Sequence, residues 1–347
     1  MNGIGTYVLQ MLRHWAAMPC GLRFEVYLHE SARFRFDGVA FPENFSLNWI
    51  SSRRFRDTDN LRRFIFSNML AARRMKHVIF NASQLEMTFF GARQVVTVHD
   101  LIPLVVNGHY QRKQHYYCRF ALPLGLARAM AIITPSQATR RDLLARFRID
   151  PARVAVIAHG VRRFPARDNG TKPARGRKYI LFAGRIVPYR NVDRLVQAFL
   201  AIQHRVEHDL VLAGEVFHEL HLPAGNSRVT SLGYVSDEEL GALYEGASAF
   251  VFPSLAEGFG MTPAEAMALG CPVVASREAS LPEVCGPAAL LVDPWSIESI
   301  AEGMVRVLLD ERLRDTLSRE GVNRATELSW EKSAREHIRI FEQVAGH

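Results

Sequence analysis

The sequence predicts an α/β protein built from two doubly wound parallel sheets in tandem. Short apolar runs alternate with segments of helical periodicity, which is typical of parallel α/β layers. Several of these runs end directly at a glycine, a histidine or an arginine, the residue types that line the carboxyl edge of a parallel sheet when a ligand binds there. The chain has 347 residues, enough for about two domains.

The first half of the chain contains the first series of predicted strands. They cover residues 95–98, 131–134 and 154–157. The first ends at His99, and the second is followed by a helix from Pro135-Ser136 to about residue 147. Residues 162–178 are rich in Arg, Pro, Gly and Lys without an apolar period, which indicates a linker between domains.

The second half repeats the alternation. Predicted strands cover residues 179–182, 210–213, 250–252, 273–275 and 290–292. Predicted helices cover residues 191–201 and 263–269, and a last helical segment begins near Ser329. Arg185, Gly184 and Gly214 follow strand ends here, as His99 does in the first half. If the two sheets face each other across a cleft, these residues converge on it.

Charge is spread unevenly along the chain. Residues 1–170 carry 25 Lys and Arg against 11 Asp and Glu, whereas the remainder carries 18 against 24. The basic half indicates an anionic partner, for which nucleic acid, an anionic membrane and a phosphorylated lipid all qualify. No nucleic-acid-binding motif is recognised, so we expect no nucleic-acid partner.

Two basic amphipathic stretches, residues 53–76 and 110–128, are typical either of a membrane-surface segment or of a core helix with solvated arginines. No apolar run approaches the roughly 18 residues of a membrane helix, and residues 1–15 lack the layout of a secretion signal. The four cysteines are scattered and form no C-x-x-C pair. We therefore expect a cytoplasmic protein, peripheral on the inner face of the membrane, without a metal site.

The segment Glu257-Gly-Phe-Gly-Met-Thr-Pro-Ala-Glu265 is the most informative in the chain. A loop carrying one carboxylate leads into a helix carrying the other, and exposed N–H groups at a helix start bind anions. The pattern suits a phosphorylated ligand with hydroxyl groups on both flanks, such as a sugar nucleotide. An alternative is a capping box from Thr262 to Glu265, in which Glu265 bonds only to its own helix end.

With these residues in hand, the chain resembles the retaining glycosyltransferases of the two-Rossmann (GT-B) type in the large group called family 4. The segment from Glu257 to Glu265 is similar to that family's E-x7-E motif, and Gly184-Arg185-Ile-Val-Pro-Tyr-Arg190-Asn191 is similar to its basic donor loop. Further similar segments are Thr97-Val-His99-Asp100-Leu-Ile-Pro103, Ile133-Thr-Pro-Ser136, Gly270-Cys-Pro-Val-Val-Ala-Ser276, Leu281-Pro-Glu-Val284 and Ser329-Trp330-Glu331.

The resemblance implies a domain plan. Residues 1–165 form the acceptor-side Rossmann-like domain, 166–177 the linker, and 178–329 the nucleotide-sugar donor domain. The C-terminal helix, residues 330–347, packs back on the first domain. The family usually begins with an apolar strand before its glycine turn, whereas this sequence starts at the turn, so the first domain is expected without its usual first strand.

The resemblance also implies roles for residues. Glu265 binds the donor ribose, and Glu257 binds a hydroxyl of the transferred sugar with backbone N–H groups of Gly258, Phe259, Gly260 and Met261. Arg185 and Arg190 grip the diphosphate, where the family commonly has Lys at the second position. His99 reaches the sugar, and Gly3 and Gly5 approach the phosphates and the acceptor.

The expected activity is metal-independent, retaining hexosyl transfer without a cofactor, because fixed cations can stabilise the leaving diphosphate. Similarity to the bacterial mannosyltransferase branch favours GDP-mannose as donor, with UDP-glucose and related donors left open. A lipid-linked or polysaccharide acceptor in bacterial surface glycan synthesis is expected. Two alternatives are a sugar-nucleotide epimerase of the same fold and a non-catalytic nucleotide-sugar-binding subunit.

Overall fold

A computed structural model describes residues 3–51, 60–73, 77–89, 93–106, 112–164, 177–217, 220 and 225–346. The chain divides into two compact units. Unit 1 comprises Met1–Gly160 and Trp330–His347, and unit 2 comprises Val161–Ser329. Each contains parallel strands connected by helices, which confirms the predicted α/β class. The predicted linker, residues 166–177, lies outside the described residues except for residue 177.

The described strands of unit 2 form one parallel sheet in the order β12-β11-β10-β7-β8-β9. Their bounds are β7 Tyr179–Ala183, β8 Asp209–Ala213, β9 Val229–Gly233, β10 Ala249–Phe252, β11 Val273–Ser276 and β12 Ala289–Val292. The predicted strands are confirmed. β9 was not predicted, because this edge strand is half-buried and its polar residues give no apolar run.

The strand order places a switch point between β7 and β10. From β7 the chain moves outward through β8 and β9, then returns to β10 on the other side of β7. From the carboxyl edge of these two neighbouring strands, the chain therefore continues in opposite directions along the sheet, from β7 to β8 and from β10 to β11. In open parallel sheets the crevice at such a switch point is where ligands bind.

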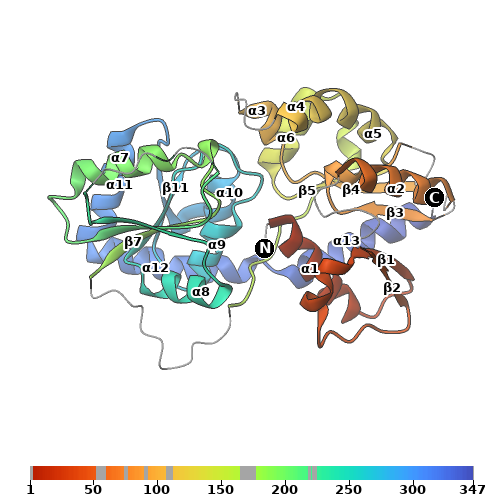
Figure 1. Ribbon diagram of the computed structural model, residues 1–347, viewed down its shortest axis with the longest axis horizontal. Coiled ribbons are helices and arrows are strands. Elements are labelled where there is room, and N and C mark those ends of the chain that lie inside the picture. Colours follow the sequence, from red (N-terminus) through yellow and green to blue (C-terminus); the bar gives the residue numbers. More distant parts are fainter. Residues whose placement is uncertain are drawn as a thin grey trace. The chain divides into compact units, whose positions relative to one another are not determined.

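Helices cover both faces of this sheet, which explains why every residue of β7, β10 and β11 is buried. Helices α7 (Val192–Ile202) and α11 (Ile297–Leu309) pack together on one face (Figure 1). Helices α9 (Met261–Ala268) and α12 (Glu311–Glu327) pack together on the other. The remaining elements of the unit are α8 (Asp237–Gly246), α10 (Leu281–Cys285), η6 (Pro188–Arg190) and η7 (Gly286–Ala288).

The described strands of unit 1 form two parallel sheets rather than one. β1 (Phe24–His29) pairs with β2 (Phe45–Ile50), and the second sheet has the order β3-β4-β5-β6. Its strands are β3 Val78–Asn81, β4 Arg93–Thr97, β5 Ala131–Thr134 and β6 Val154–Val156. The three predicted strands are confirmed as β4, β5 and β6, whereas β1, β2 and β3 were missed because most of their residues are only half-buried.

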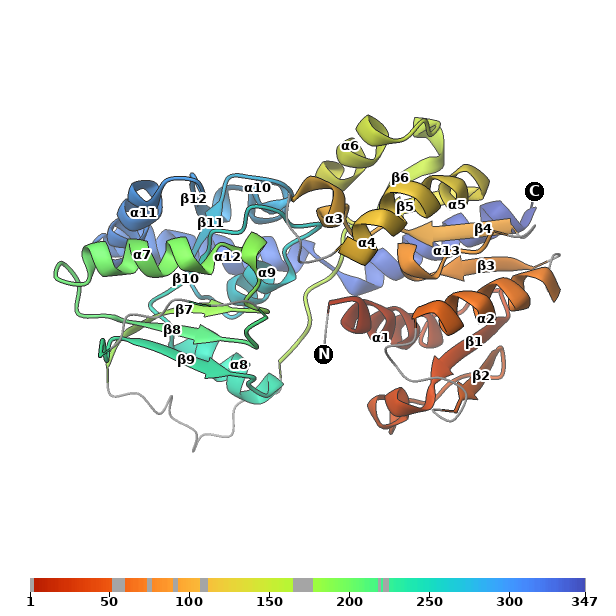
Figure 2. The same ribbon diagram turned by 45° about the horizontal axis from the view of Figure 1, so that its top comes forward.

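The helices of unit 1 include the first and last of the chain, α1 (Gly3–Ala16) and α13 (Trp330–Gly346), which lie against each other (Figure 2). The Trp15 indole of α1 donates a hydrogen bond to the carbonyl of Ala334 at 3.1 Å. The other helical elements are η1 Glu30–Phe36, α2 Asn60–Arg73, η2 Gln84–Glu86, α3 Ile102–Val105, α4 Arg112–Tyr116, η4 Tyr117–Ala121, α5 Leu122–Arg128, α6 Gln137–Arg146 and η5 Pro151–Arg153. Within the described ranges, no helix is both long and apolar enough to cross a bilayer.

Candidate functional site

The loop after β7 is shaped by two glycines with positive φ. A Cβ at Gly214 would lie 1.9 Å from the carbonyl oxygen of Gly184, so the two backbones approach too closely for any side chain there. A Cβ at Gly184 would lie 2.8 Å from Nη1 of Arg190. Because neither position carries a side chain, the backbone of Gly184 can approach Gly214, and the Arg190 guanidinium can lie close to the backbone of Gly184.

Asn191 and Tyr189 fasten this loop to the one that follows β10. Asn191 has a left-handed backbone (φ 62°), and its Nδ2 donates to the carbonyls of Pro253 at 3.0 Å and Pro294 at 2.7 Å. The carbonyl of Tyr189 accepts from the backbone N–H of Leu255 at 2.8 Å. The loops on either side of the switch point are thus held together by backbone-directed hydrogen bonds.

This arrangement brings Arg190 and Glu257 into contact. Nη2 of Arg190 lies 3.1 Å from Oε1 of Glu257, and the two side chains are 17% and 10% exposed. The guanidinium also lies over the Phe252 ring, 4.9 Å from its centroid. Nε and Nη1 of Arg190 are buried and have no hydrogen-bond partner among the residues that the structure describes. A buried cation with donor atoms still unused is suited to an anion.

The segment after Glu257 leads into the start of α9. Ser280 Oγ lies 3.0 Å from the carbonyl oxygen of Glu257 and 2.8 Å from that of Phe259, and so stabilises the turn that precedes α9. Gly260 has φ 105°, and a Cβ there would lie 2.7 Å from Leu281. Helix α9 begins directly afterwards at Met261, and the N–H groups of a first helical turn have no partners within the helix.

Glu265 lies inside unit 2 with an arginine beside it. Its Oε1 is 2.7 Å from Nε of Arg162, and its Oε2 accepts a long, 3.4 Å hydrogen bond from the hydroxyl of Tyr244. Burial raises the pKa of Glu265, and the Arg162 guanidinium opposes that rise. The capping-box alternative is wrong, because the residue that caps α9 is Gly260 and Thr262 already lies within the helix.

Arg185 makes a different contact from Arg190. Its guanidinium stacks on the Phe217 ring, with Cζ 4.1 Å from the ring centroid. The structure thus brings Arg190 to Glu257, whereas Arg185, on the same loop after β7, packs against Phe217 of the loop after β8. The expected joint grip on a diphosphate stays a prediction for Arg185.

In unit 1, His99 sits at the carboxyl ends of β3 and β4. Its Nε2 lies 2.8 Å from the carbonyl oxygen of Ala82, which can only accept, so Nε2 carries the proton and Nδ1 keeps its lone pair. Burial lowers the pKa of His99 to about 4, so the ring is neutral at neutral pH. Nδ1 therefore remains an acceptor.

His99 belongs to a buried cluster that joins α1 to α13. Its ring meets Tyr7 edge-on at 4.9 Å, and Tyr7 also contacts His159 at 4.9 Å. The hydroxyl of Tyr7 lies 2.7 Å from Nε2 of His337, whose Nδ1 donates to the carbonyl of Ser333. Helix α1 begins at Gly3 and includes Gly5 in its first turn. This packing therefore positions the two glycines relative to His99.

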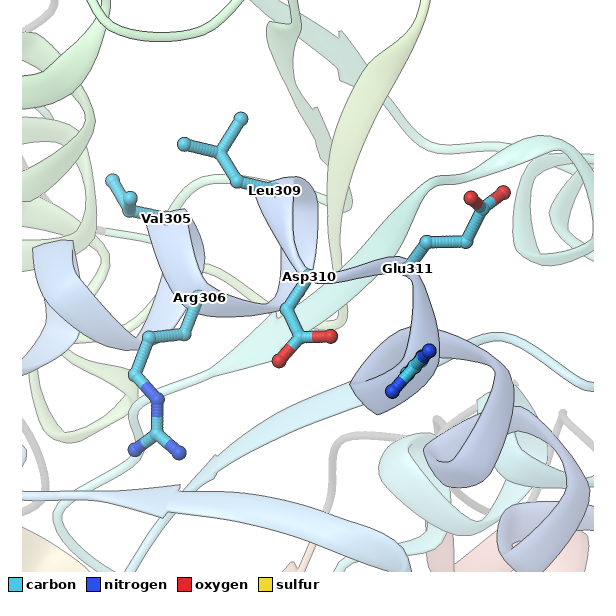
Figure 3. A pocket seen from close by; sticks show the side chains of 6 residues that line it. Val305, Arg306, Leu309, Asp310 and Glu311 are labelled. Atoms are coloured by element: carbon cyan, nitrogen blue, oxygen red, sulfur yellow. The ribbon is translucent and has the colours of Figure 1, made fainter.

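A hollow of about 600 Å³ lies at the junction of α11 and α12 (Figure 3). It is lined by Val305, Arg306, Leu309, Asp310, Glu311 and Arg312. The labelled side chains point in different directions in Figure 3, and none of the predicted site residues lines the hollow. It offers no converging polar groups, so the switch-point crevice is the candidate site.

Several residues of this site were not assigned a role from the sequence. Arg162 lies in the segment predicted as a linker, and Tyr244 and Ser280 carried no signal because their contacts join residues 21 positions apart in the chain. Ser254 contacts Glu257 three positions away, and it also reaches the carbonyl oxygen of Tyr189 across the fold. In the described part of the chain, no group of three or more His, Cys, Asp or Glu side chains could hold a metal ion, while His218 and His221 lie outside it.

Comparison with known families covers nearly the whole chain. The family model described as Glycosyltransferase Family 4 matches residues 1–163, and the one described as Glycosyl transferases group 1 matches residues 165–324. The chain is 30% identical over 289 residues to the O-antigen chain mannosyltransferase B of Escherichia coli, covering 78% of this chain and 76% of that protein. It is 32% identical over 282 residues to the MMP alpha-(1->4)-mannosyltransferase of Mycolicibacterium hassiacum, covering 75% and 67%.

Solved structures share the architecture. The sucrose-phosphate synthase of Thermosynechococcus elongatus superposes with a TM-score of 0.74 at 21% identity, covering 99% of this chain and 93% of that one. The HepE protein of Anabaena, solved with UDP and glucose, superposes with a TM-score of 0.75 at 16% identity, covering 99% and 96%. At these identities the likeness concerns the fold alone.

Proposed function

Because this chain belongs to the family 4 glycosyltransferases and has the GT-B fold, we propose that it catalyses metal-independent transfer of mannose from GDP-mannose with retention of configuration. The proposed acceptor is a glycan carried on a polyprenyl diphosphate lipid or a growing polysaccharide. The chain's place in glycan synthesis is shared with its mannosyltransferase relatives. The donor and the acceptor are the parts that go beyond this family membership.

The observation that carries the proposal is the buried Arg190 beside Glu257 at the switch point. Arg190 has two buried nitrogen atoms without a hydrogen-bond partner in the described residues, which is costly unless a ligand supplies acceptors. A diphosphate does so, because its oxygens match the planar guanidinium fork. Glu257, held 3.1 Å away, supplies a carboxylate for a sugar hydroxyl next to that phosphate.

The chemistry follows from charge. When the bond between the sugar C1 and the phosphate oxygen breaks, its electron pair stays on the diphosphate. Arg190 and the N-terminal end of α9 are fixed where this negative charge develops, so no reorganisation is needed during the reaction. The acceptor oxygen then bonds to C1 on the same face, and its proton passes to the leaving phosphate oxygen.

The other predicted residues take supporting roles in this proposal. His99 is neutral and presents Nδ1 as an acceptor for a sugar hydroxyl. Backbone groups of residues 258–261 bind the transferred sugar, and Glu265 binds the ribose. Arg185, Gly184 and Gly214 flank the diphosphate, while Gly3 and Gly5 approach the phosphates and the acceptor.

Nucleotide preference tests the donor assignment. In a thermal-shift panel of GDP, UDP, ADP and their sugar conjugates, GDP and GDP-mannose are expected to raise the melting temperature most, because a ligand that binds only the folded state stabilises it. GDP release from GDP-mannose with a lipid-linked acceptor then measures transfer. A larger shift with UDP-sugars would contradict the donor assignment, and conversion of the donor alone to an epimer would contradict transfer.

The membrane part of the proposal concerns an exposed stripe on unit 1. Tyr116, Phe120 and Leu124 recur every four residues along α4, η4 and α5 and are 61%, 63% and 56% exposed. The opposite side of the same segment, which includes Leu122 and Leu126, is buried in the core. Exposed arginine and lysine side chains flank the stripe at Arg112, Lys113, Arg119 and Arg128, and residues 112–130 contain no Asp or Glu. This combination supports attachment to an anionic bilayer on the inner face of the cytoplasmic membrane.

Vesicle binding tests this attachment. The double variant Tyr116→Ser/Phe120→Ser is expected to bind vesicles of anionic phospholipid at least about tenfold more weakly than the unmodified chain, since each ring contributes apolar area. Unmodified protein is expected to dissociate at high salt. Tyr234→Ser, which removes a 68% exposed aromatic side chain from unit 2, is the matched control. Equal and negligible binding to neutral and anionic vesicles would refute attachment.

A further inference from the structure

Arg162 links three elements of unit 2 around a buried carboxylate. It is the second residue of that unit, and its side chain is 14% exposed. Nε lies 2.7 Å from Oε1 of Glu265 on α9, and Nη1 lies 2.7 Å from Oδ1 of Asp237 at the start of α8. The guanidinium also covers the Phe164 ring, with Cζ 4.4 Å from the centroid.

The surroundings hold Arg162 in this position. The Phe164 ring meets the Tyr244 ring edge-on at 5.7 Å and lies against Gly241, where a Cβ would be 3.2 Å from it. Asp237 belongs to a first helical turn that also carries Glu238 and Glu239, so the guanidinium sits beside acidic groups. The forked guanidinium of Arg162 therefore contacts two carboxylates at once. The single ammonium group of lysine is less suited to bridging both.

The two oxygens of Glu265 are held unequally. Oε1 is engaged closely by Arg162. Among the residues that the structure describes, Oε2 has only the 3.4 Å bond from Tyr244, which is longer than a strong O–H···O bond. A carboxylate buried without a cation takes up a proton and loses its value as an acceptor. Burial does raise the pKa of Glu265, and Arg162 is the group that counters this most strongly.

We propose that Arg162 is a positioning residue, which holds the Glu265 carboxylate in one orientation with Oε2 directed to accept a ribose hydroxyl of the donor nucleotide. This inference rests on the proposed function, because it assumes that a nucleotide binds next to α9. It assigns to the segment that enters unit 2 a part in nucleotide recognition. Asp237 and Phe164 act indirectly, because they hold the Arg162 guanidinium in place.

The test compares nucleotides that differ only in the ribose. Calorimetric Kd values are measured for GDP and UDP and for their 2′-deoxy counterparts. The unmodified chain is expected to prefer the ribonucleotide by about tenfold, the size of one hydrogen bond to a charged acceptor. In Arg162→Met this preference is expected to fall to about twofold or less, and Arg162→Lys is expected to restore part of it.

The pH profile separates positioning from general structural damage. In Arg162→Met the ribose preference is expected to decline as the pH falls from 8 to 6, because Glu265 without its cation is protonated at higher pH, whereas the unmodified chain stays flat. Arg163→Met changes an exposed neighbouring arginine and serves as the matched control. If Arg162→Met does not fold, Arg162→Lys and Asp237→Asn report on the same ratio.

The outcomes distinguish this inference from the proposed function. If the unmodified chain binds neither GDP nor UDP, the proposed function fails. If it binds them with a ribose preference that Arg162→Met and Asp237→Asn both leave unchanged at every pH, only the assignment of Arg162 is overturned. Loss of the preference in Arg162→Met with partial rescue by lysine supports it.

Discussion

Replacement of Arg190 by alanine is expected to lower kcat/KM by about 10²- to 10³-fold, the usual effect of removing one preorganised group from a developing negative charge. Two consequences combine. The leaving diphosphate loses the guanidinium whose Nε and Nη1 are held ready for it. Glu257 loses the cation that lies 3.1 Å from its carboxylate. We expect kcat to fall more than nucleotide affinity, because the charge on the leaving group is greatest in the transition state.

Arg190→Lys is expected to retain measurable activity, about tenfold below the unmodified chain, because charge is kept while the planar fork is lost. Steady-state kinetics with saturating acceptor, together with GDP affinity by calorimetry, separate the two effects. Arg205→Ala, which breaks a surface ion pair with Glu302, is the matched control and should leave kinetics unchanged. An Arg190→Ala enzyme with unaltered kcat/KM would remove Arg190 from the site.

Unit 1 is expected to lose at least about 4 kcal/mol of stability between pH 7.5 and pH 5, because His99 and His337 are buried in neutral form. Burial lowers the pKa of both His99 and His337 to about 4, against about 6.5 in an unfolded chain. As the pH falls below 6.5, the unfolded chain takes up protons that the folded chain does not. Stability therefore decreases by about 2 kcal/mol per histidine at pH 5 and continues to decrease towards pH 4.

The contacts explain why neither ring accepts a proton readily. Nε2 of His337 accepts from the hydroxyl of Tyr7, so protonation would break this bond and force the hydroxyl to turn towards Oγ1 of Thr97, 2.9 Å away. The His337 ring otherwise faces Trp15, Phe80 and Phe341, which offer no counter-charge. His99 faces Tyr7 and His159, and burial lowers the pKa of His159 as well.

Hydrogen exchange reports the loss of stability of unit 1 segment by segment. It is measured from pH 7.5 to pH 5 and corrected for intrinsic rates. Protection of α1 and α13 is expected to decline more steeply with acid than protection of β7 and β10 in unit 2. His337→Gln should reduce the slope, because glutamine can accept from Tyr7 without titrating, whereas His204→Gln changes an exposed histidine and should not. Parallel decline in both units would contradict the prediction.

Much of the fold could be predicted from the sequence. Strands such as β7 and β10 are buried on both faces, so their residues form continuous apolar runs that stand out. β1, β2, β3 and β9 were missed because they are half-buried, and short mixed runs do not differ from loops. The separation of β1 and β2 into their own sheet depends on which strands pair, and no local pattern specifies that.

The candidate site divides in the same way. Gly184, Arg190, Glu257 and Gly260 could be found because each follows a strand or precedes a helix, where local chemistry is restrictive. The contact between Arg190 and Glu257 depends on β7 lying beside β10. Arg162 could not be found at all, since it lies in a basic segment without periodicity and its partner is 103 positions away in the chain.

The amino-acid sequence by itself determined the class of this protein, its two-part plan, and the residue types that its chemistry requires. Buried strands, helix starts and glycine turns each have a characteristic local sequence pattern, which is why they could be predicted. Only the tertiary structure decided which charges pair, which histidines are buried neutral, and which oxygen of Glu265 lies against Arg162. Those properties depend on distances of a few ångströms between residues far apart in the chain, and on burial by elements that no local segment encodes.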